Sequence, residues 1–243
     1  MVKKKYTRLD STNKKARQLL ELGEISSSAW IQADDQYMGK GLGENTWESE
    51  PGKNITGSMV IFPENVSPEN QFDLSIVASL AICDLLELFL DNVKIKWPND
   101  IYVDTKKIAG ILVEHTILGK KICNSVLGIG LNINQVAFSI DIPNPVSLKQ
   151  LVGLEMDLGE ITDLLLDCIN NRLDSLEAGK ADLNRSDYLK RLFRFREYAP
   201  YQARKKWFKA QIIDVSRYGH LVLENEKGER TEFGFKEVEF IVD

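Results

Sequence analysis

A lysine, an amide and a carboxylate occur within five residues in Lys96-Trp97-Pro98-Asn99-Asp100. The run follows an apolar stretch typical of a β-strand, so the polar side chains are expected at a strand end. There the Lys96 ammonium can neutralise phosphate and the Asp100 carboxylate can hold Mg²⁺. The alternative is a salt-bridged turn with the tryptophan packed beneath it. The run therefore indicates a candidate triphosphate site.

A glycine-rich stretch, Gly39-Lys40-Gly41-Leu42-Gly43-Glu44-Asn45-Thr46-Trp47, forms part of a polar segment of nearly twenty residues between two predicted strands. Closely spaced glycines let backbone N–H groups approach an anion, and Lys40 adds a positive charge. The spacing matches neither a Walker loop nor a Rossmann fingerprint. A flexible surface loop is the alternative, but loops this long are uncommon without a function.

Two apolar stretches, 106–114 and 128–134, carry glycine inside a predicted strand. Glycine weakens a strand, so its presence at Gly110 and Gly130 indicates a ligand or another backbone lying close. Asn132 offers both a donor and an acceptor to an adenine edge. The alternative for the second stretch is a β-bulge followed by a turn asparagine.

The composition is that of a folded protein: 43% of the 243 residues are hydrophobic and 28% are charged. The net charge of −5 and the scattered Lys and Arg residues give no reason to expect nucleic acid as a partner. The basic segment 1–5 lacks the features of a signal peptide and is interpreted as a solvated end. No apolar run is long enough to cross a membrane, so a cytoplasmic location is expected.

The three cysteines, at 83, 123 and 168, are widely spaced in apolar segments, which favours buried free thiols. The two histidines lie far apart, with no Cys or carboxylate at metal-ligand spacing, so a zinc site is not expected.

The elements expected to position these residues follow from hydrophobic periodicity. Helices are predicted after a Ser11-Thr12-Asn13 cap and over residues 72–90, 148–154, 161–176 and 186–195. Strands are predicted over residues 29–33, 55–62, 93–97, 108–115 and 122–131. Further short strands are predicted over residues 206–215, 220–223, 230–233 and 238–242. The expected fold is α+β: a mixed, largely antiparallel central sheet flanked by helices in residues 1–195, and a small β-barrel or sheet in residues 196–243.

In this order and at these spacings, the stretches from about Tyr6 to Asn134 resemble the biotin protein ligases. The most specific part is Lys96-Trp97-Pro98-Asn99-Asp100 followed by Lys107-Ile108-Ala109-Gly110. The resemblance implies that ATP, with Mg²⁺, activates biotin as biotinyl-5′-AMP, and that the biotinyl group passes to a lysine of a biotin carboxyl carrier protein. It also implies an SH3-like form for the C-terminal barrel.

The resemblance assigns roles to individual residues. It implies that biotin is bound by Ser11, Thr12, Asn13, Gln36, Gly39, Lys40, Gly41, Leu42, Lys107 and Gly110. It implies that ATP is bound by Lys40, Lys96, Asn99, Asp100, Gly130 and Asn132. The expected catalytic residues are Lys107, Lys96 and Asp100, and Asp100 is also the expected magnesium ligand.

The glycine-rich loop departs from the family pattern Gly-Arg-Gly-Arg-Arg-Gly. Lys40 stands at the first arginine, Leu42 and Gly43 stand at the next two, and Glu44 replaces the last glycine. Lysine cannot hold a carboxylate or phosphate bidentately as arginine does, so the loop is expected to order less tightly over the adenylate.

Two alternatives to a biotin ligase stay open. One is a lipoate or octanoate ligase of the sister family, and the other is a non-catalytic biotin sensor, which the altered loop suggests. Only about ten residues precede Ser11, too few for a helix-turn-helix, so no repressor function is expected. A homodimer through an edge of the central sheet is compatible with the resemblance.

Overall fold

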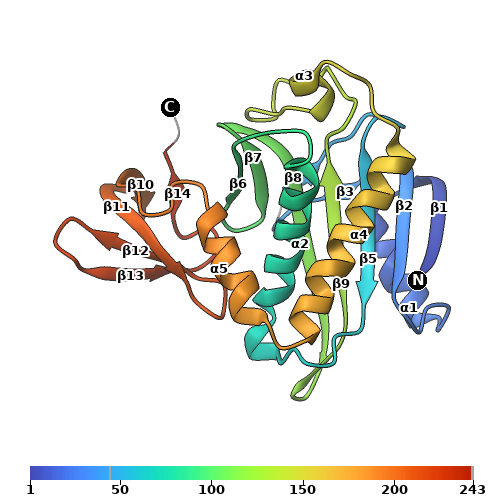
Figure 1. Ribbon diagram of the computed structural model, residues 1–243, viewed down its shortest axis with the longest axis horizontal. Coiled ribbons are helices and arrows are strands. Elements are labelled where there is room, and N and C mark those ends of the chain that lie inside the picture. Colours follow the sequence, from blue (N-terminus) through green and yellow to red (C-terminus); the bar gives the residue numbers. More distant parts are fainter. Residues whose placement is uncertain (44, 242–243) are drawn as a thin grey trace.

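The apolar runs of the N-terminal part pair into one mixed sheet in the computed structural model, which describes residues 1–43 and 45–241 (Figure 1). Seven strands lie in the order β1-β2-β5-β9-β8-β7-β6. Neighbouring strands are antiparallel except for the parallel pair β1 and β2. The strands are β1 (Val2–Leu9), β2 (Ala29–Gln36), β5 (Ile55–Ile61), β6 (Val93–Lys96), β7 (Asp100–Val103), β8 (Lys106–Leu118) and β9 (Lys121–Leu131). The predicted α+β class with a largely antiparallel sheet is confirmed.

The N-terminal segment is a strand, so its interpretation as a solvated end is wrong. Val2–Leu9 forms β1 at the edge of the sheet, with its side chains mostly exposed. An edge strand accommodates charged residues, because its outer side faces water. Here the basic side chains meet acidic residues of β2: Lys5 lies 2.9 Å from Asp34, and Arg8 lies 3.0 Å from Asp35. The strand was therefore missed because its residues are mostly basic and exposed.

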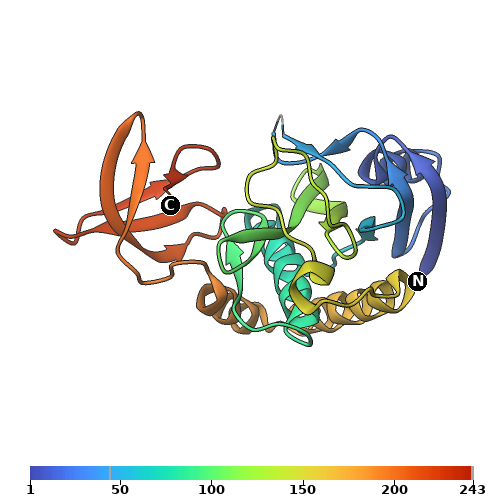
Figure 2. The same cartoon turned by 90° about the horizontal axis from the view of Figure 1, so that it is seen from above.

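Helices cover both faces of the sheet. On one face lie α2 (Phe72–Leu86), α4 (Leu158–Glu177) and α5 (Ala181–Arg191), and α1 (Thr12–Glu21) lies on the other (Figures 1 and 2). A short helix α3 (Leu148–Val152) and a 3-10 turn over Pro68–Asn70 complete the set. The helix α2 is buried almost all round, because the sheet and two helices enclose it. Among the described helices, none is both long and apolar enough to cross a bilayer.

The helix α1 positions the first polar cluster of the sequence. Ser11 caps it by accepting a hydrogen bond from Lys14 N, and Ala16 and Leu19 bury its apolar face against the sheet. Its first turn thereby faces the middle of the sheet, where β5 and β9 pass beneath Asn13. The predicted cap is confirmed and fixes where Ser11 and Thr12 point.

The C-terminal part folds into a separate antiparallel sheet, ordered β13-β12-β11-β10-β14 (Figure 1). Its strands are β10 (Ala199–Ala203), β11 (Lys206–Val215), β12 (Leu221–Asn225), β13 (Arg230–Phe233) and β14 (Glu239–Phe240). Within residues 1–43 and 45–241 no pairing joins β13 to β14, so of the two expected forms, a small barrel or a sheet, this part has the form of an open sheet. It is tied to the first part by a 2.8 Å hydrogen bond from Trp97 Nε1 to the carbonyl of Gly219.

The predicted long loop between β2 and β5 contains its own hairpin. Two-residue strands, β3 (Gly39–Lys40) and β4 (Thr46–Trp47), pair antiparallel across the glycine-rich turn. The helix ends also differ from the periodicity: α2 ends at Leu86 rather than at residue 90, and α5 begins at Ala181 rather than at residue 186. Apolar residues beyond a helix end can still pack against the core from a turn, as the partly buried Phe89 does here, and this extends the apparent helical period.

Candidate active site

The glycine-rich hairpin and the C-terminal sheet enclose a cavity of about 410 Å³ on the face of the sheet that carries α1. Its lining comes from the chain segments that begin at Ser11, Lys40, Lys96, Lys107, Gly128 and Lys236, together with Gln36. All of the predicted site residues line it except Gly39 and Asn132. Stretches far apart in sequence therefore meet in one place, as the resemblance implies.

One end of the cavity is made of hydroxyl and amide groups, and we call Thr12, Asn13 and Gln36 the hydroxyl–amide end. The backbone N–H of Thr12 donates to Gln36 Oε1 at 2.8 Å, and the Thr12 hydroxyl lies 3.1 Å from the same oxygen. Beneath them, Ser58 Oγ lies 2.8 Å from Thr12 Oγ1 and 2.6 Å from Asn13 Oδ1. The polar atoms of this end are thus held in place by the protein itself.

Asn13 connects this end to charged groups outside the cavity lining. Its amide nitrogen donates to the carbonyl of Leu112 at 3.2 Å and to Glu114 Oε2 at 2.8 Å. The other Glu114 oxygen lies 3.2 Å from Arg17. Asn13 also packs so closely on Gly128 that a β-carbon there would overlap its side chain. The glycine in this strand is needed for close approach, as the sequence indicated.

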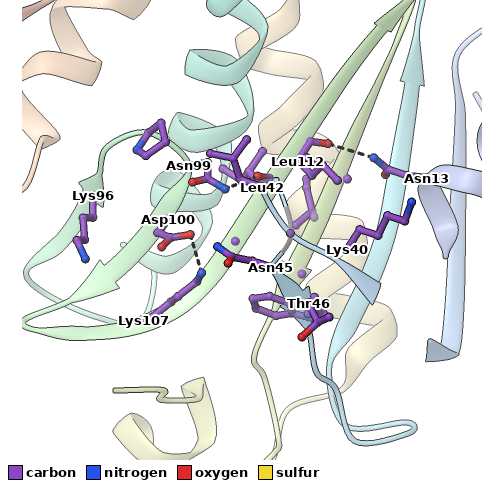
Figure 3. Close-up of a pocket in the computed structure, with 18 of the residues that line it drawn as sticks. Asn13, Lys40, Leu42, Asn45, Thr46, Lys96, Asn99, Asp100, Lys107 and Leu112 are labelled. Atoms are coloured by element: carbon purple, nitrogen blue, oxygen red, sulfur yellow. Dashed lines mark hydrogen bonds and ion pairs between the residues drawn. The ribbon is translucent and has the colours of Figure 1, made fainter. Parts of the chain in front are cut away.

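The opposite side of the cavity is charged, and we call Lys96, Asp100 and Lys107 the lysine end. Lys107 Nζ lies 2.7 Å from Asp100 Oδ1, and the two side chains are 27% and 22% exposed. Figure 3 shows this ion pair on the other side of the cavity from Asn13. Asn99 donates to the carbonyl of Ile111 at 2.8 Å, which links the turn before β7 to β8. The lysine end presents positive charge with a carboxylate beside it.

Lys96 lies at the junction of the two parts of the chain. Its Nζ is 3.1 Å from the Tyr102 hydroxyl and 5.7 Å from the centre of the Phe240 ring of β14. Burial lowers the pKa of the Lys96 ammonium, Arg194 adds to this effect, and Asp100 partly opposes it. A desolvated ammonium gains more from an incoming phosphate than an exposed one does.

Trp47 is a lining residue that is absent from the predicted site. Its ring lies against Gly110 and Gly130, where a β-carbon on Gly110 would come within 3.1 Å of the ring and one on Gly130 would overlap it. Lys107 Nζ lies 5.8 Å from the centre of the same ring. The sequence contained a signal for Trp47 as a site residue. Trp47 ends the glycine-rich stretch, and Gly110 and Gly130 indicate that a bulky group lies close to their strands.

The C-terminal sheet contributes lining residues that the sequence did not indicate. Lys236, Val238, Glu239 and Phe240 all line the cavity. The Lys236 ammonium lies directly against Gly43 of the glycine-rich loop, in the space that a side chain at Gly43 would fill. A positive charge from a distant segment thus stands beside a position where the family pattern has an arginine.

Two predicted residues lie outside the lining. Gly39 pairs with Trp47 in the β3–β4 hairpin and supports the loop from behind. Asn132 is buried, and its amide nitrogen donates to the carbonyl of Val146 at 3.1 Å. Its Oδ1 is buried without a hydrogen-bond partner among the described residues, so an acceptor remains free. The binding roles of Gly39 and Asn132 stay predictions.

The cysteines do not take part in the site. Cys83 is fully buried in α2, and burial raises the pKa of its thiol well above the ordinary range. Cys123 and Cys168 are half-buried free thiols, and neither lines the cavity. In residues 1–43 and 45–241, no three His, Cys, Asp or Glu side chains are grouped to hold a metal by themselves. The site therefore offers lysines, amides and hydroxyls rather than a thiol nucleophile.

Comparison with known proteins gives a consistent result. Residues 6–132 match the Biotin/lipoate A/B protein ligase family. The biotin–[acetyl-CoA-carboxylase] ligase of Paracoccus denitrificans is 34% identical over 165 residues, which span 65% of this chain and 67% of that protein. The bifunctional ligase/repressor BirA of Escherichia coli (strain K12) is 31% identical over 173 residues, which span 70% of this chain and 52% of BirA. The chain thus covers about half the length of that second relative.

The fold as a whole also has a counterpart among solved structures. The biotin protein ligase from Aquifex aeolicus in complex with biotin and ATP superposes with a TM-score of 0.82 at 22% sequence identity. The match covers 100% of this chain and 99% of that one. The similarity therefore includes the C-terminal sheet.

Proposed function

Because the chain belongs to the Biotin/lipoate A/B protein ligase family, we propose that it is an ATP-dependent biotin ligase. It activates biotin as biotinyl-5′-AMP and transfers the biotinyl group to a lysine of a biotin carboxyl carrier protein. The name of the Paracoccus denitrificans relative, biotin–[acetyl-CoA-carboxylase] ligase, supports a carboxylase as the source of that carrier. The observation that carries the proposal is the cavity itself, with a hydroxyl–amide end and a lysine end.

The two ends suit the two halves of the first reaction. The hydroxyl–amide end offers Thr12 and Gln36 to the cyclic urea of biotin, while the lysine end receives the carboxylate and the phosphates. The carboxylate oxygen attacks the α-phosphorus of ATP, the new O–P bond forms, and pyrophosphate leaves with the electron pair of the broken bond. Lys107 and Lys96 neutralise the charge that gathers there, each contributing about 2 to 4 kcal/mol of barrier lowering.

The second step needs no further protein nucleophile. The unprotonated amino group of the carrier lysine attacks the acyl carbon of the mixed anhydride. The amide bond forms as the acyl C–O bond breaks, AMP leaves with the electron pair of that bond, and the nitrogen releases a proton. Holding the anhydride in position provides most of the rate enhancement, because the protein turns a bimolecular encounter into an oriented one. Trp47, which covers Gly110 and Gly130, supports this by shielding the anhydride from water.

Magnesium fits the lysine end only together with the nucleotide. Mg²⁺ commonly binds one or two carboxylates plus substrate phosphates, and among the described residues Asp100 and Glu239 supply carboxylates to the lining. Asp100 Oδ1 already meets Lys107 at 2.7 Å, so the carboxylate also serves to hold that lysine. When bound, the ion would neutralise phosphate charge.

We propose that the nucleotide base binds beside Asn132, the residue that follows β9. The unpartnered Oδ1 of Asn132 is an acceptor that the amino group of adenine would satisfy. Gly130, two residues before Asn132 and near the end of β9, lines the cavity. We also propose that residues 1–195 form the catalytic part and residues 196–243 a C-terminal part, and that the protein is cytoplasmic.

The test is pyrophosphate release from ATP and Mg²⁺ with biotin, lipoate or octanoate supplied singly, followed by transfer to a carrier-domain lysine. Release with biotin alone is the expected outcome. Release with lipoate or octanoate instead would assign the protein to the sister group of ligases. Tight biotin binding without any release would indicate a sensor, for which the altered glycine-rich loop is the motivating observation.

A further inference from the structure

A row of polar groups lies behind the Thr12 hydroxyl, and its deeper members, Ser58 and Glu114, lie outside the cavity lining. It runs from Glu114 through Asn13 to Ser58 and ends at the Thr12 hydroxyl, which lines the cavity. Ser58 is fully buried, and Asn13 and Thr12 are buried to within a few per cent. Because Ser58 is fully buried and both of its contacts are with protein groups, those groups set the direction of its hydrogen bonds.

The orientation of the Asn13 amide follows from its neighbours. One amide atom faces the carbonyl of Leu112 at 3.2 Å and Glu114 Oε2 at 2.8 Å, and both of these accept only. That atom must be the NH₂ group, so the amide oxygen faces Ser58.

The remaining hydrogens then have one consistent arrangement. Asn13 Oδ1 cannot donate, so its 2.6 Å contact with Ser58 uses the Ser58 hydrogen. Ser58 Oγ and Thr12 Oγ1 are 2.8 Å apart, and two hydroxyl oxygens at that distance must share a hydrogen. Since the Ser58 hydrogen is used, the hydrogen between them belongs to Thr12. The Thr12 hydroxyl therefore points its hydrogen into the protein and a lone pair into the cavity.

Gln36 does not change this result. Its Oε1 accepts from the backbone N–H of Thr12 at 2.8 Å, which fixes it as the acceptor on that side. Gln36 Oε1 also lies 3.1 Å from Thr12 Oγ1, so it offers the Thr12 hydroxyl hydrogen a second acceptor within the protein. In either arrangement Thr12 meets a ligand as an acceptor.

We propose that Glu114, Asn13 and Ser58 are positioning residues that preset Thr12 to accept an N–H hydrogen bond, so that the site selects acids carrying a ring N–H donor. The inference rests on the proposed function, in which that donor is one urea N–H of biotin. The dithiolane ring of lipoate has no N–H, so it leaves the buried Thr12 lone pair unsatisfied. Unpaired buried polar groups of this kind give strong discrimination between ligands.

We call Glu114, Asn13 and Ser58 the relay. The experiment removes the N–H donor from the ligand and, separately, the Ser58 hydroxyl from the relay. Dissociation constants are measured by calorimetry for biotin and for its two cyclic carbamate analogues, in which one urea N–H is replaced by oxygen. The wild-type protein is expected to bind one of the carbamates about 100-fold more weakly than biotin, because two lone pairs then face each other. In Ser58→Ala the Thr12 hydrogen keeps only the longer, 3.1 Å contact with Gln36 Oε1, so the hydroxyl turns and donates to a ligand more readily, and that preference should fall at least about tenfold.

The matched control is Ser79→Ala. Ser79 is equally buried, but its hydroxyl donates to the carbonyl of Ser75 within α2, away from the cavity. This variant should keep the full preference for biotin, and both variants should keep the wild-type KM for ATP. Ser58→Cys retains a weak donor and should give an intermediate preference, which provides a second reading if Ser58→Ala does not fold.

The outcomes separate the relay from the proposed function. If wild-type protein binds biotin and both carbamates equally, or if folded Ser58→Ala keeps the full preference, the relay is overturned while the biotin assignment stands. If wild-type protein binds lipoate rather than biotin, the proposed function fails first. A preference that is lost in Ser58→Ala and kept in Ser79→Ala supports the relay, because a purely structural role for Ser58 would weaken all three ligands alike.

Discussion

The two ends of the cavity are held in different ways. At the hydroxyl–amide end, Thr12 and Asn13 belong to a helix packed on the sheet, and their polar groups are hydrogen-bonded to buried protein atoms. At the lysine end, Lys96 and Lys107 come from two different strands, and Lys236 reaches in from the C-terminal sheet. One end is rigid before a ligand arrives, whereas the other consists of long side chains gathered around a space.

This difference matches what each end has to recognise. A cyclic urea is neutral, so it is recognised by the direction of hydrogen bonds, which requires groups that cannot turn. A triphosphate is recognised largely by charge, which acts over longer distances and tolerates flexible lysines. We therefore expect substitutions at the lysine end to reduce rate and ATP use, and substitutions at the hydroxyl–amide end to change ligand preference.

The largest expected effect is that of Lys107→Ala. Lys107 pairs with Asp100 at 2.7 Å and lies where the carboxylate and phosphate charges meet in the proposed reaction. Its loss should slow pyrophosphate release about 100-fold or more while the fold survives. The neighbouring Lys106 is exposed and does not line the cavity, so Lys106→Ala is the control. Equal rates for the two variants would remove Lys107 from the mechanism.

The next effect is expected at Trp47, which covers the floor between the two ends. Trp47→Ala opens the space above Gly110 and Gly130, and should weaken biotin affinity about 10- to 100-fold through lost apolar contact. Trp47→Phe keeps an aromatic cover and should recover most of this loss. The measurement is biotin affinity without ATP. If both variants bind like wild-type protein, the hairpin does not close over the acid.

The sequence predicted the position of Thr12 and Asn13 at the hydroxyl–amide end, because the signals for their helix are local, whereas Gln36 was expected there only from the resemblance. Ser11-Thr12-Asn13 is a helix cap followed by apolar residues at helical spacing, so the position of Thr12 follows from the position of the helix. Ser58 was not predicted, since a serine inside a buried strand gives no sign of its partners until that strand is placed beneath Asn13. Sequence patterns specify elements, and second-layer contacts follow only from how the elements pack.

The lysine end was only partly predictable. Lys96, Asp100 and Lys107 lie within one stretch of chain, and their grouping follows from short hairpins. Lys236 follows them by well over one hundred residues, in a turn whose charge resembles that of any solvated surface. Only the docking of the C-terminal sheet brings it to Gly43. The β1 edge strand was missed for a similar reason, because its lysines suggested a solvated tail.

Lys236 offers a test of whether the C-terminal sheet belongs to the lysine end. Lys236→Ala should raise the KM for ATP about 3- to 10-fold, with a larger effect at low salt, because an exposed charge contributes modestly and is screened. Lys227 lies exposed in another turn of the same sheet, outside the cavity lining, and Lys227→Ala is the control. An unchanged KM in Lys236→Ala would confine the lysine end to the first sheet.

The smallest expected effect is on pH dependence, and it also separates the two ends. Burial lowers the pKa of Lys96 in the free protein, so this ammonium loses its proton at a less alkaline pH than an ordinary lysine. Its attraction for phosphate is full below that pKa and is lost as the pH rises through it. The KM for ATP should therefore rise at alkaline pH, whereas biotin affinity should not follow the same curve.

The control is Lys96→Arg. The arginine side chain keeps its charge throughout, because its pKa lies above the range of pH measured, so this variant should flatten the rise in the KM for ATP. A rise of the same size in the arginine variant would assign the titration to another group.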